Sequence, residues 1–213
     1  MEIEVEEEVS RLGVNIITDI ISDVIVKPSR KDVFSILADE VRSEIKENYK
    51  SISFLKEDPK IRAYRSFYWK IGIDPTKTRL SSEALVRRFF RKGIPLINNM
   101  VDAGNLSSAR SLIPIGLYDV GELKGDPVLR LSISGDIFRG IGGKDEVMTD
   151  GIPVLADDKG VIHLYPHRDS MRTRITERTE EVFMVACGVR GIRQKDLESS
   201  IEGVVYYYDQ LRG

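Results

Sequence analysis

The 213-residue sequence is poor in cysteine, histidine and side-chain amides, and it has no long hydrophobic run. The single cysteine, Cys187, excludes an internal disulfide, and its apolar neighbours predict a buried strand over residues 182–187. No apolar run approaches the roughly 20 residues that span a bilayer, and the acidic N-terminus lacks the positive charge of a secretory signal. We therefore expect a cytoplasmic protein with no membrane segment.

The two histidines, His163 and His167, are poorly placed for a metal site. They stand four residues apart with Pro166 between them, and strand geometry would not put them on a shared metal face. The glycine-rich segment 140–144 lacks the Gly-Lys-Ser/Thr ending of a phosphate loop and predicts a hairpin turn. The sequence thus predicts neither a metal nor a cofactor.

Asparagines are concentrated in one place, because residues 98–105 hold three of the five in the chain. Asparagine is a poor helix former whose uncharged amide supplies donors and an acceptor. A helix beginning near Pro95 would place Ile97 and Val101 on a packing face. The other face would carry Asn98, Asp102 and Asn105. We interpret this polar face as a ligand site, with structural capping as the alternative.

Charge is distributed unevenly along the chain, although the net charge is only -2. Residues 1–59 carry 14 acidic and 8 basic side chains, whereas residues 60–92 carry 10 basic and 2 acidic ones. We place a boundary at this change, between an acidic N-terminal α/β extension, residues 1–59, and a main domain, residues 60–213. The basic stretch can bind phosphates.

Hydrophobic spacing predicts the main elements. Apolar residues recur at helical spacing from Asp32 to Ile45, over 61–70, from Ser81 onwards and over 197–211, and strands are predicted over 14–26 and 128–134.

The predicted helix from Ser81 has a basic side. This side carries Arg87, Arg88 and Arg91, and Glu83 can pair with Arg87 at i,i+4. Contact with nucleic acid and a merely solvated face are both compatible with this pattern.

A second polar run, residues 168–176, lies just before the predicted buried strand. Short polar runs at the mouths of strands often line sites. The run contains Arg168, Asp169, Ser170 and Thr173. The alternative to a site is a solvated loop stabilised by Arg–Asp pairs.

Two motifs resemble a known family. Residues 95–105, Pro-Leu-Ile-Asn-Asn-Met-Val-Asp-Ala-Gly-Asn, and residues 114–119, Pro-Ile-Gly-Leu-Tyr-Asp, are similar to the B3/B4 domain of the phenylalanyl-tRNA synthetase beta subunit. That family carries an Asn-Asn-x-Val-Asp-x-x-Asn run and a Pro-x-His-x-Phe-Asp segment at similar spacing. Residues 79–88 look like the free-standing branch of B3/B4 proteins, and the resemblance covers roughly residues 62–195.

The resemblance implies an α+β fold, with a mixed or antiparallel sheet core and helices packed on one side, and a role near tRNA. In the synthetase, this domain hydrolyses the ester of tyrosine mischarged onto phenylalanine tRNA. The family's histidine falls on Gly116 here, and the glutamate that recognises tyrosine falls near Val185. These departures argue against tyrosine-specific editing.

The resemblance also implies site residues. The family's amide-rich run falls on Asn98, Asn99, Asp102 and Asn105, and its closing aspartate falls on Asp119. A hydrolase would use Asn98 and Asn105 for substrate orientation or the oxyanion, Asp102 or Asp169 for water, and Asn99, Asp119, Arg168, Ser170 and Thr173 for substrate binding.

We therefore expect an RNA-binding B3/B4-like protein that engages tRNA or aminoacyl-tRNA. The residues expected to contact RNA are Arg79, Arg87, Arg88 and Arg91. The sequence leaves open whether the protein also hydrolyses aminoacyl esters. The alternatives are a small-molecule binding module without RNA, for an amino-acid-like ligand, and a protein-interaction domain that uses the acidic extension.

Overall fold

The centre of the fold is a three-stranded antiparallel sheet in the order β2–β10–β3. We describe it from a computed structural model that covers residues 3–91 and 93–213. Every residue of β10 (Val182–Val189) is buried, as its continuous apolar run predicts for a strand covered on both faces. The strands β2 (Val14–Ile21) and β3 (Ile115–Asp119) pair with its two edges.

A second sheet packs against the first. Its strand order is β1–β4–β7–β8–β9, and all of its pairs are antiparallel except β1 with β4. The Tyr165 hydroxyl donates to the Gly188 carbonyl at 2.6 Å and ties the two sheets together. The strands are β1 (Glu4–Val5), β4 (Val128–Leu131), β7 (Pro153–Asp157), β8 (Gly160–Leu164) and β9 (Arg168–Asp169).

A short hairpin extends from this region. It consists of β5 (Ile137–Arg139) and β6 (Asp145–Val147), and the glycine-rich segment between them forms the predicted turn.

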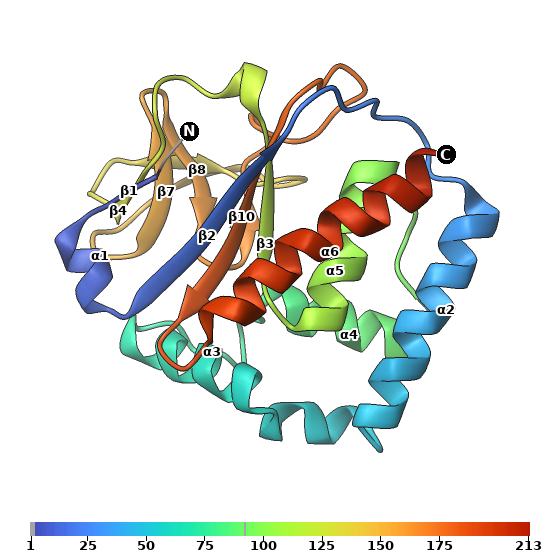
Figure 1. Ribbon diagram of the computed structural model, residues 1–213. Coiled ribbons are helices and arrows are strands. Elements are labelled where there is room, and N and C mark those ends of the chain that lie inside the picture. The colour runs from blue at the N-terminus through green and yellow to red at the C-terminus, as the bar shows by residue number, and fades with distance from the viewer. Residues whose placement is uncertain (1–2, 92) are drawn as a thin grey trace.

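Helices cover the other face of the three-stranded sheet. In Figure 1, α6 lies in front of α5, α2 runs along the right side, and α3 lies across the lower end. The helices are α1 (Glu7–Arg11), α2 (Lys31–Asn48), α3 (Pro59–Lys70), α4 (Ser81–Arg91), α5 (Asn99–Ser111) and α6 (Gln194–Arg212), with 3-10 turns at Ile52–Glu57 and Val120–Glu122. The expected α+β fold with mixed and antiparallel sheets is confirmed. None of the helices in the described part of the chain has the length and hydropathy of a membrane span.

Small residues let α5 pack closely on both of its neighbours. A Cβ atom on Gly203 of α6 would lie 2.5 Å from the Ser107 hydroxyl of α5, and that hydroxyl donates to the Ser200 carbonyl at 2.6 Å. A Cβ atom on Gly104 would lie 2.7 Å from the Leu117 side chain of β3. These contacts fix α5 between α6 and the sheet.

The segment expected as an acidic extension, residues 1–59, supplies β1, α1, β2 and α2. β2 pairs with β10 along its full length, and α2 contributes Phe34 and Val41 to the same hydrophobic core as the later helices. The change in charge at residue 59 therefore marks no separate core.

The start of α5 differs from the sequence expectation. The helix begins at Asn99 rather than near Pro95, because Asn98 is extended and its side chain accepts a hydrogen bond from the Val101 amide at 2.8 Å. Asp102 accepts from the Ile97 amide at 3.1 Å, which holds the preceding loop against the first turn. Two of the polar side chains thus define the helix end.

His167 generates a prediction about stability and pH. It packs edge-on against Tyr68, its Nδ1 has no hydrogen-bond partner among the described residues, and burial lowers its pKa from 6.5 to about 4. Because the unfolded chain binds this proton and the folded chain does not, stability falls as the pH drops from 6.5 to 4. The His167 contribution to this loss is roughly 3 kcal/mol.

Urea unfolding at pH 7 and pH 4 measures this effect in the wild type and in His167→Gln. Protonation of carboxylates at low pH destabilises the wild type and the variant equally. The variant should therefore lose less stability between the two pH values, because it lacks the His167 contribution. An equal pH dependence in the two proteins would contradict the prediction.

Candidate functional site

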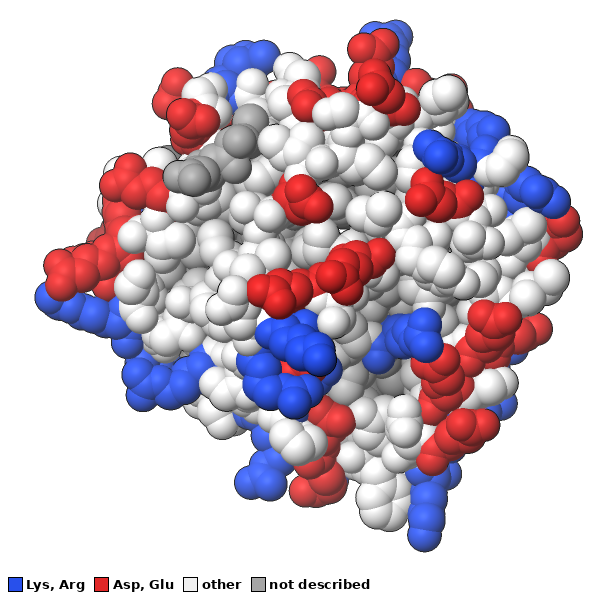
Figure 2. Space-filling model, viewed as in Figure 1, with Lys and Arg blue, Asp and Glu red and all other residues white. Residues whose placement is uncertain are grey.

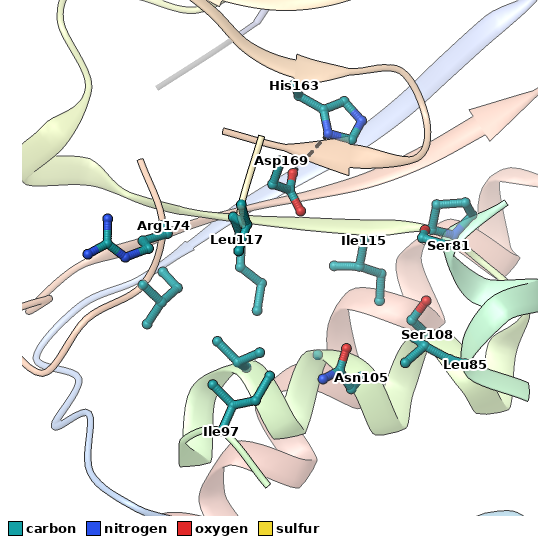
Figure 3. Close-up of a pocket in the computed structure, with 15 residues that line it drawn as sticks. Ser81, Leu85, Ile97, Asn105, Ser108, Ile115, Leu117, His163, Asp169 and Arg174 are labelled. Carbon is teal, nitrogen blue, oxygen red and sulfur yellow. Dashed lines mark hydrogen bonds and ion pairs between the residues drawn. The ribbon is translucent and has the colours of Figure 1, made fainter. Parts of the chain in front are cut away.

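A cavity of about 240 Å³ lies between α5 and β3, close to the end of the β8–β9 hairpin. Figure 3 shows α5 along the lower side of the cavity and β3 above it. Much of the wall is aliphatic and comes from Leu85, Ile97, Val101, Ile115, Leu117 and Ile175. Ligand pockets for larger molecules start at about 300 Å³, so this volume suits a group of the size of an amino-acid side chain.

The face of α5 that lines the cavity is not the one that we expected. Val101, Gly104, Asn105 and Ser108 lie at the helical spacing that brings them to the cavity. Asn105 is half-buried and its amide points from α5 towards β3 (Figure 3). The Ser108 hydroxyl is already engaged, because it donates to the Ile113 carbonyl at 2.7 Å. Asn105 is therefore the polar group that α5 offers to a ligand.

A histidine and a carboxylate stand on the opposite wall. His163 of β8 and Asp169 of β9 are paired in register, and the Nδ1 atom of His163 lies 2.9 Å from Asp169 Oδ1 (Figure 3). The Asp169 side chain keeps 32% of its surface exposed, whereas that of His163 keeps 5%. The carboxylate is thus the more accessible member of the pair.

Two further groups surround this pair from the protein interior. The Cys187 thiol lies 3.8 Å from His163 Nε2, and burial raises its pKa well above the usual range. The Tyr118 ring packs edge-on against His163 at 6.2 Å, and its pKa is also raised, first by burial and then by the charge of Asp169. Both groups stay protonated. Cys187 is fully buried, as predicted.

Asn98, Asn99 and Asp102 do not line the cavity. Asn98 caps α5, and Asn99 is fully buried, where it accepts from the Lys27 amide at 3.1 Å and donates to the Ile25 carbonyl at 2.9 Å. We expected these side chains to face a ligand together with Asn105, and this expectation is wrong. They are used to join α5 to the segment that follows β2.

Asp102 is also committed to the interior. It is fully buried and accepts from the Ser29 hydroxyl at 2.6 Å. Burial raises its pKa, while the hydrogen bonds from Ser29 and the Ile97 amide oppose that shift. Asp102 does not line the cavity, so its position gives no support to the expected role in placing water.

The expected substrate-binding residues likewise hold other parts of the fold. Asp119 accepts from the Thr179 hydroxyl at 2.6 Å and from the Gly121 amide. Arg168 pairs with Glu146 at 2.8 Å.

Ser170 and Thr173, which we also expected to bind substrate, are buried beside the site. Ser170 accepts from the Arg172 amide at 3.1 Å, and the Thr173 hydroxyl has no partner among the described residues. Within the polar run 168–176, the side chains that reach the cavity belong to Asp169, Arg174 and Ile175.

The arginines of the α4 region divide into two kinds. Arg87 pairs with the buried Glu83 at 2.8 Å, and Arg65 of α3 pairs with the same carboxylate. The charge of Arg87 therefore compensates a buried carboxylate. The other three, Arg79, Arg88 and Arg91, are exposed. Lys92, which completes the basic stretch, lies outside the described residues.

No basic surface is visible on the face that carries α6 and α2. Figure 2 shows lysines and arginines interspersed with aspartates and glutamates over this face.

Sequence reasoning missed His163 as part of the cavity. We considered it only with His167, and a spacing of four residues gave no sign that it pairs with Asp169 across a hairpin. The register of β8 and β9, which aligns the two residues, could have been found only by predicting that hairpin. Among the described residues, no three His, Cys, Asp or Glu side chains are arranged to hold a metal ion.

Comparison with known proteins identifies the family. Residues 63–202 match the B3/4 domain. The chain belongs to this family. Curated relatives are the beta subunits of phenylalanine-tRNA ligase from Paramagnetospirillum magneticum, 30% identical over 53% of this chain, and from Fusobacterium nucleatum, 26% identical over 79% of this chain. This chain spans 14% and 23% of those relatives, so it corresponds to a small part of each.

A solved structure supports the fold of this B3/4 domain protein. An N-terminal fragment of the phenylalanyl-tRNA synthetase beta subunit from Pyrococcus horikoshii aligns over 100% of this chain and 51% of its own chain, with a TM-score of 0.51 and 12% sequence identity. At this identity the likeness concerns the fold alone.

Residue 116, where the resemblance predicts a histidine in the family, leaves no room for a side chain beside Tyr118. A Cβ atom on Gly116 would lie only 2.1 Å from the Tyr118 hydroxyl. The tyrosine therefore occupies the space into which a histidine at residue 116 would project.

The asparagines should differ in their effect on stability. Asn98→Ala should cost about 1 kcal/mol, because it removes a helix cap. Asn99→Ala should cost about 2 kcal/mol, because it removes two hydrogen bonds to the backbone of Ile25 and Lys27. Asn105→Ala should change stability by less than about 0.5 kcal/mol, since its amide faces the cavity. Urea unfolding measures all three, and a reversed order would contradict this assignment.

Proposed function

We propose that this B3/4 domain protein binds tRNA or aminoacyl-tRNA, and that the cavity between α5 and β3 receives the aminoacyl end and supports hydrolysis of its ester in trans. The observation that carries the proposal is the cavity itself, which combines an aliphatic wall with Asn105 on one side and the Asp169–His163 pair on the other. Relatives of the chain are named as subunits of a tRNA ligase, and this supports the link to tRNA.

Such a hydrolysis requires the protein to place the ester, admit a water molecule and stabilise the developing oxyanion. Water adds to the ester carbonyl carbon, the bond to the ribose oxygen breaks, and the water proton passes to that oxygen. The carbonyl oxygen gains negative charge on the way, and the Asn105 amide is the donor placed to stabilise it. The aliphatic wall holds the amino-acid side chain.

A panel of tRNAs mischarged with different amino acids tests this activity. Wild-type protein should accelerate deacylation of at least one of them, with preference for aliphatic side chains over tyrosine. Asn105→Ala should lower the rate on that tRNA about 100-fold, as expected for loss of one oxyanion donor. Asn48→Ala on the exposed end of α2 is the matched control and should keep full activity. Uniform inactivity of the wild type would eliminate hydrolysis.

A separate prediction concerns RNA contact. Arg88→Ala and Arg91→Ala should each weaken tRNA binding and reduce the slope of log affinity against log salt by about 1, because each removes one phosphate contact. Arg11→Ala on α1, a similarly exposed arginine, should change neither quantity. Binding is measured by filter retention over a series of salt concentrations.

The second candidate is a small-molecule binding module that does not use RNA. It is favoured by the commitment of Arg87 to Glu83 and by the mixed charges visible in Figure 2. The salt series separates the two functions. An aliphatic cavity responds little to ionic strength, whereas affinity for tRNA falls steeply.

A further inference from the structure

Asp169 forms no ion pair with a lysine or arginine among the described residues, in contrast to several other carboxylates of the fold. Asp157 pairs with Arg172, Glu83 with two arginines, and Asp136 with Arg130 at 2.7 Å. The only ion-pair partner of Asp169 among the described residues is a histidine.

This isolation matters because Asp169 stands at the wall of the aliphatic cavity. A carboxylate in such surroundings is stabilised by an opposite charge that arrives with a ligand.

The histidine beside Asp169 is set up to act as a donor. Burial keeps the Cys187 thiol protonated, and its sulfur lies 3.8 Å from two acceptors, His163 Nε2 and the Val185 carbonyl. If the thiol donates to Nε2, that nitrogen accepts and the proton of a neutral imidazole lies on Nδ1. Nδ1 then donates to Asp169 Oδ1 over the observed 2.9 Å. This hydrogen bond orients the Asp169 carboxylate at the cavity wall.

We propose that the cavity binds the primary ammonium group of a small aliphatic amine through Asp169, with His163 and Cys187 as positioning residues. The α-ammonium of an amino acid or of an aminoacyl ester is such a group. This inference rests on the proposed function because both place a ligand in the same cavity. It adds the chemical class of that ligand, a primary aliphatic ammonium.

The other cavity residues fit this ligand class. The aliphatic wall can contact a branched side chain, and Asn105 stands opposite Asp169, where it can donate to a carbonyl next to the ammonium carbon. Arg174 is exposed at another part of the lining, and its guanidinium donates to the Met171 carbonyl at 2.8 Å. It therefore does not neutralise Asp169.

The first test is the tautomer of His163, and it needs no ligand. With only two histidines in the chain, nitrogen-15 NMR resolves both rings, and His167→Gln assigns them. The expected result is the His163 tautomer with its proton on Nδ1. Cys187→Ser should keep this tautomer, because a hydroxyl also donates, whereas Cys187→Ala should reduce its population. A proton on Nε2 in the wild type would overturn the positioning role of Cys187 and His163.

The second test compares two probes that differ only in the amine. L-Leucinamide, protonated at the pH of the experiment, should bind at least 10-fold more tightly than 4-methylpentanamide, as followed by NMR shifts of the Asn105 side-chain amide. Asp169→Asn should abolish this preference. Asp126→Asn, on an exposed loop outside the cavity, is the matched control and should preserve it. Equal affinity for the two probes, or no binding of L-leucinamide, would overturn the inference.

The outcomes also separate this inference from the proposed function. Preference for L-leucinamide without deacylation of any tRNA would support ammonium recognition while the hydrolase proposal fails. Deacylation without a preference between the two amides would support the hydrolase and overturn ammonium recognition.

Discussion

The close packing of α5 between α6 and β3 is the constraint on which the rest of the structure depends. It requires very small residues where the helix meets its neighbours. Gly104, Ser107 and Gly203 meet this requirement. A core of this density leaves few voids of ligand size. The cavity lies where aliphatic residues of β3 and Gly104 of α5 face each other, so the contact that fixes the helix also shapes the site.

The polar residues of the asparagine-rich run divide according to the side of α5 on which they lie. Asn99 and Asp102 meet the chain after β2, where exposed backbone groups need partners, whereas Asn105 lies one turn further on and faces the cavity. Buried polar groups are stable only when they are hydrogen-bonded, and the first two residues satisfy this condition completely. The same motif therefore supplies both structural bonds and one side chain for a ligand.

The sequence was sufficient to predict most helices and the buried strand β10, because helical periodicity and a continuous apolar run are local signals. It was insufficient to assign roles to the polar residues. A start at Asn99 instead of Pro95 makes Asn98 a helix cap. Which side of the helix then faces the cavity is decided by the elements packed around α5, and these are distant in the sequence. The pairing of His163 with Asp169 depends on hairpin register, which no composition or spacing revealed.

The close packing of Tyr118 on Gly116 leaves no room for a side chain at residue 116. The Tyr118 hydroxyl occupies the space beside Gly116, so a larger residue at 116 would require the tyrosine ring to move. That ring packs against His163 and Phe183, and its movement would disturb both sheets. In this chain the polar side chains opposite α5 are His163 and Asp169 of the β8–β9 hairpin. Because the fold fixes the cavity but not the strand that supplies its polar side chains, membership of the family does not by itself determine the ligand.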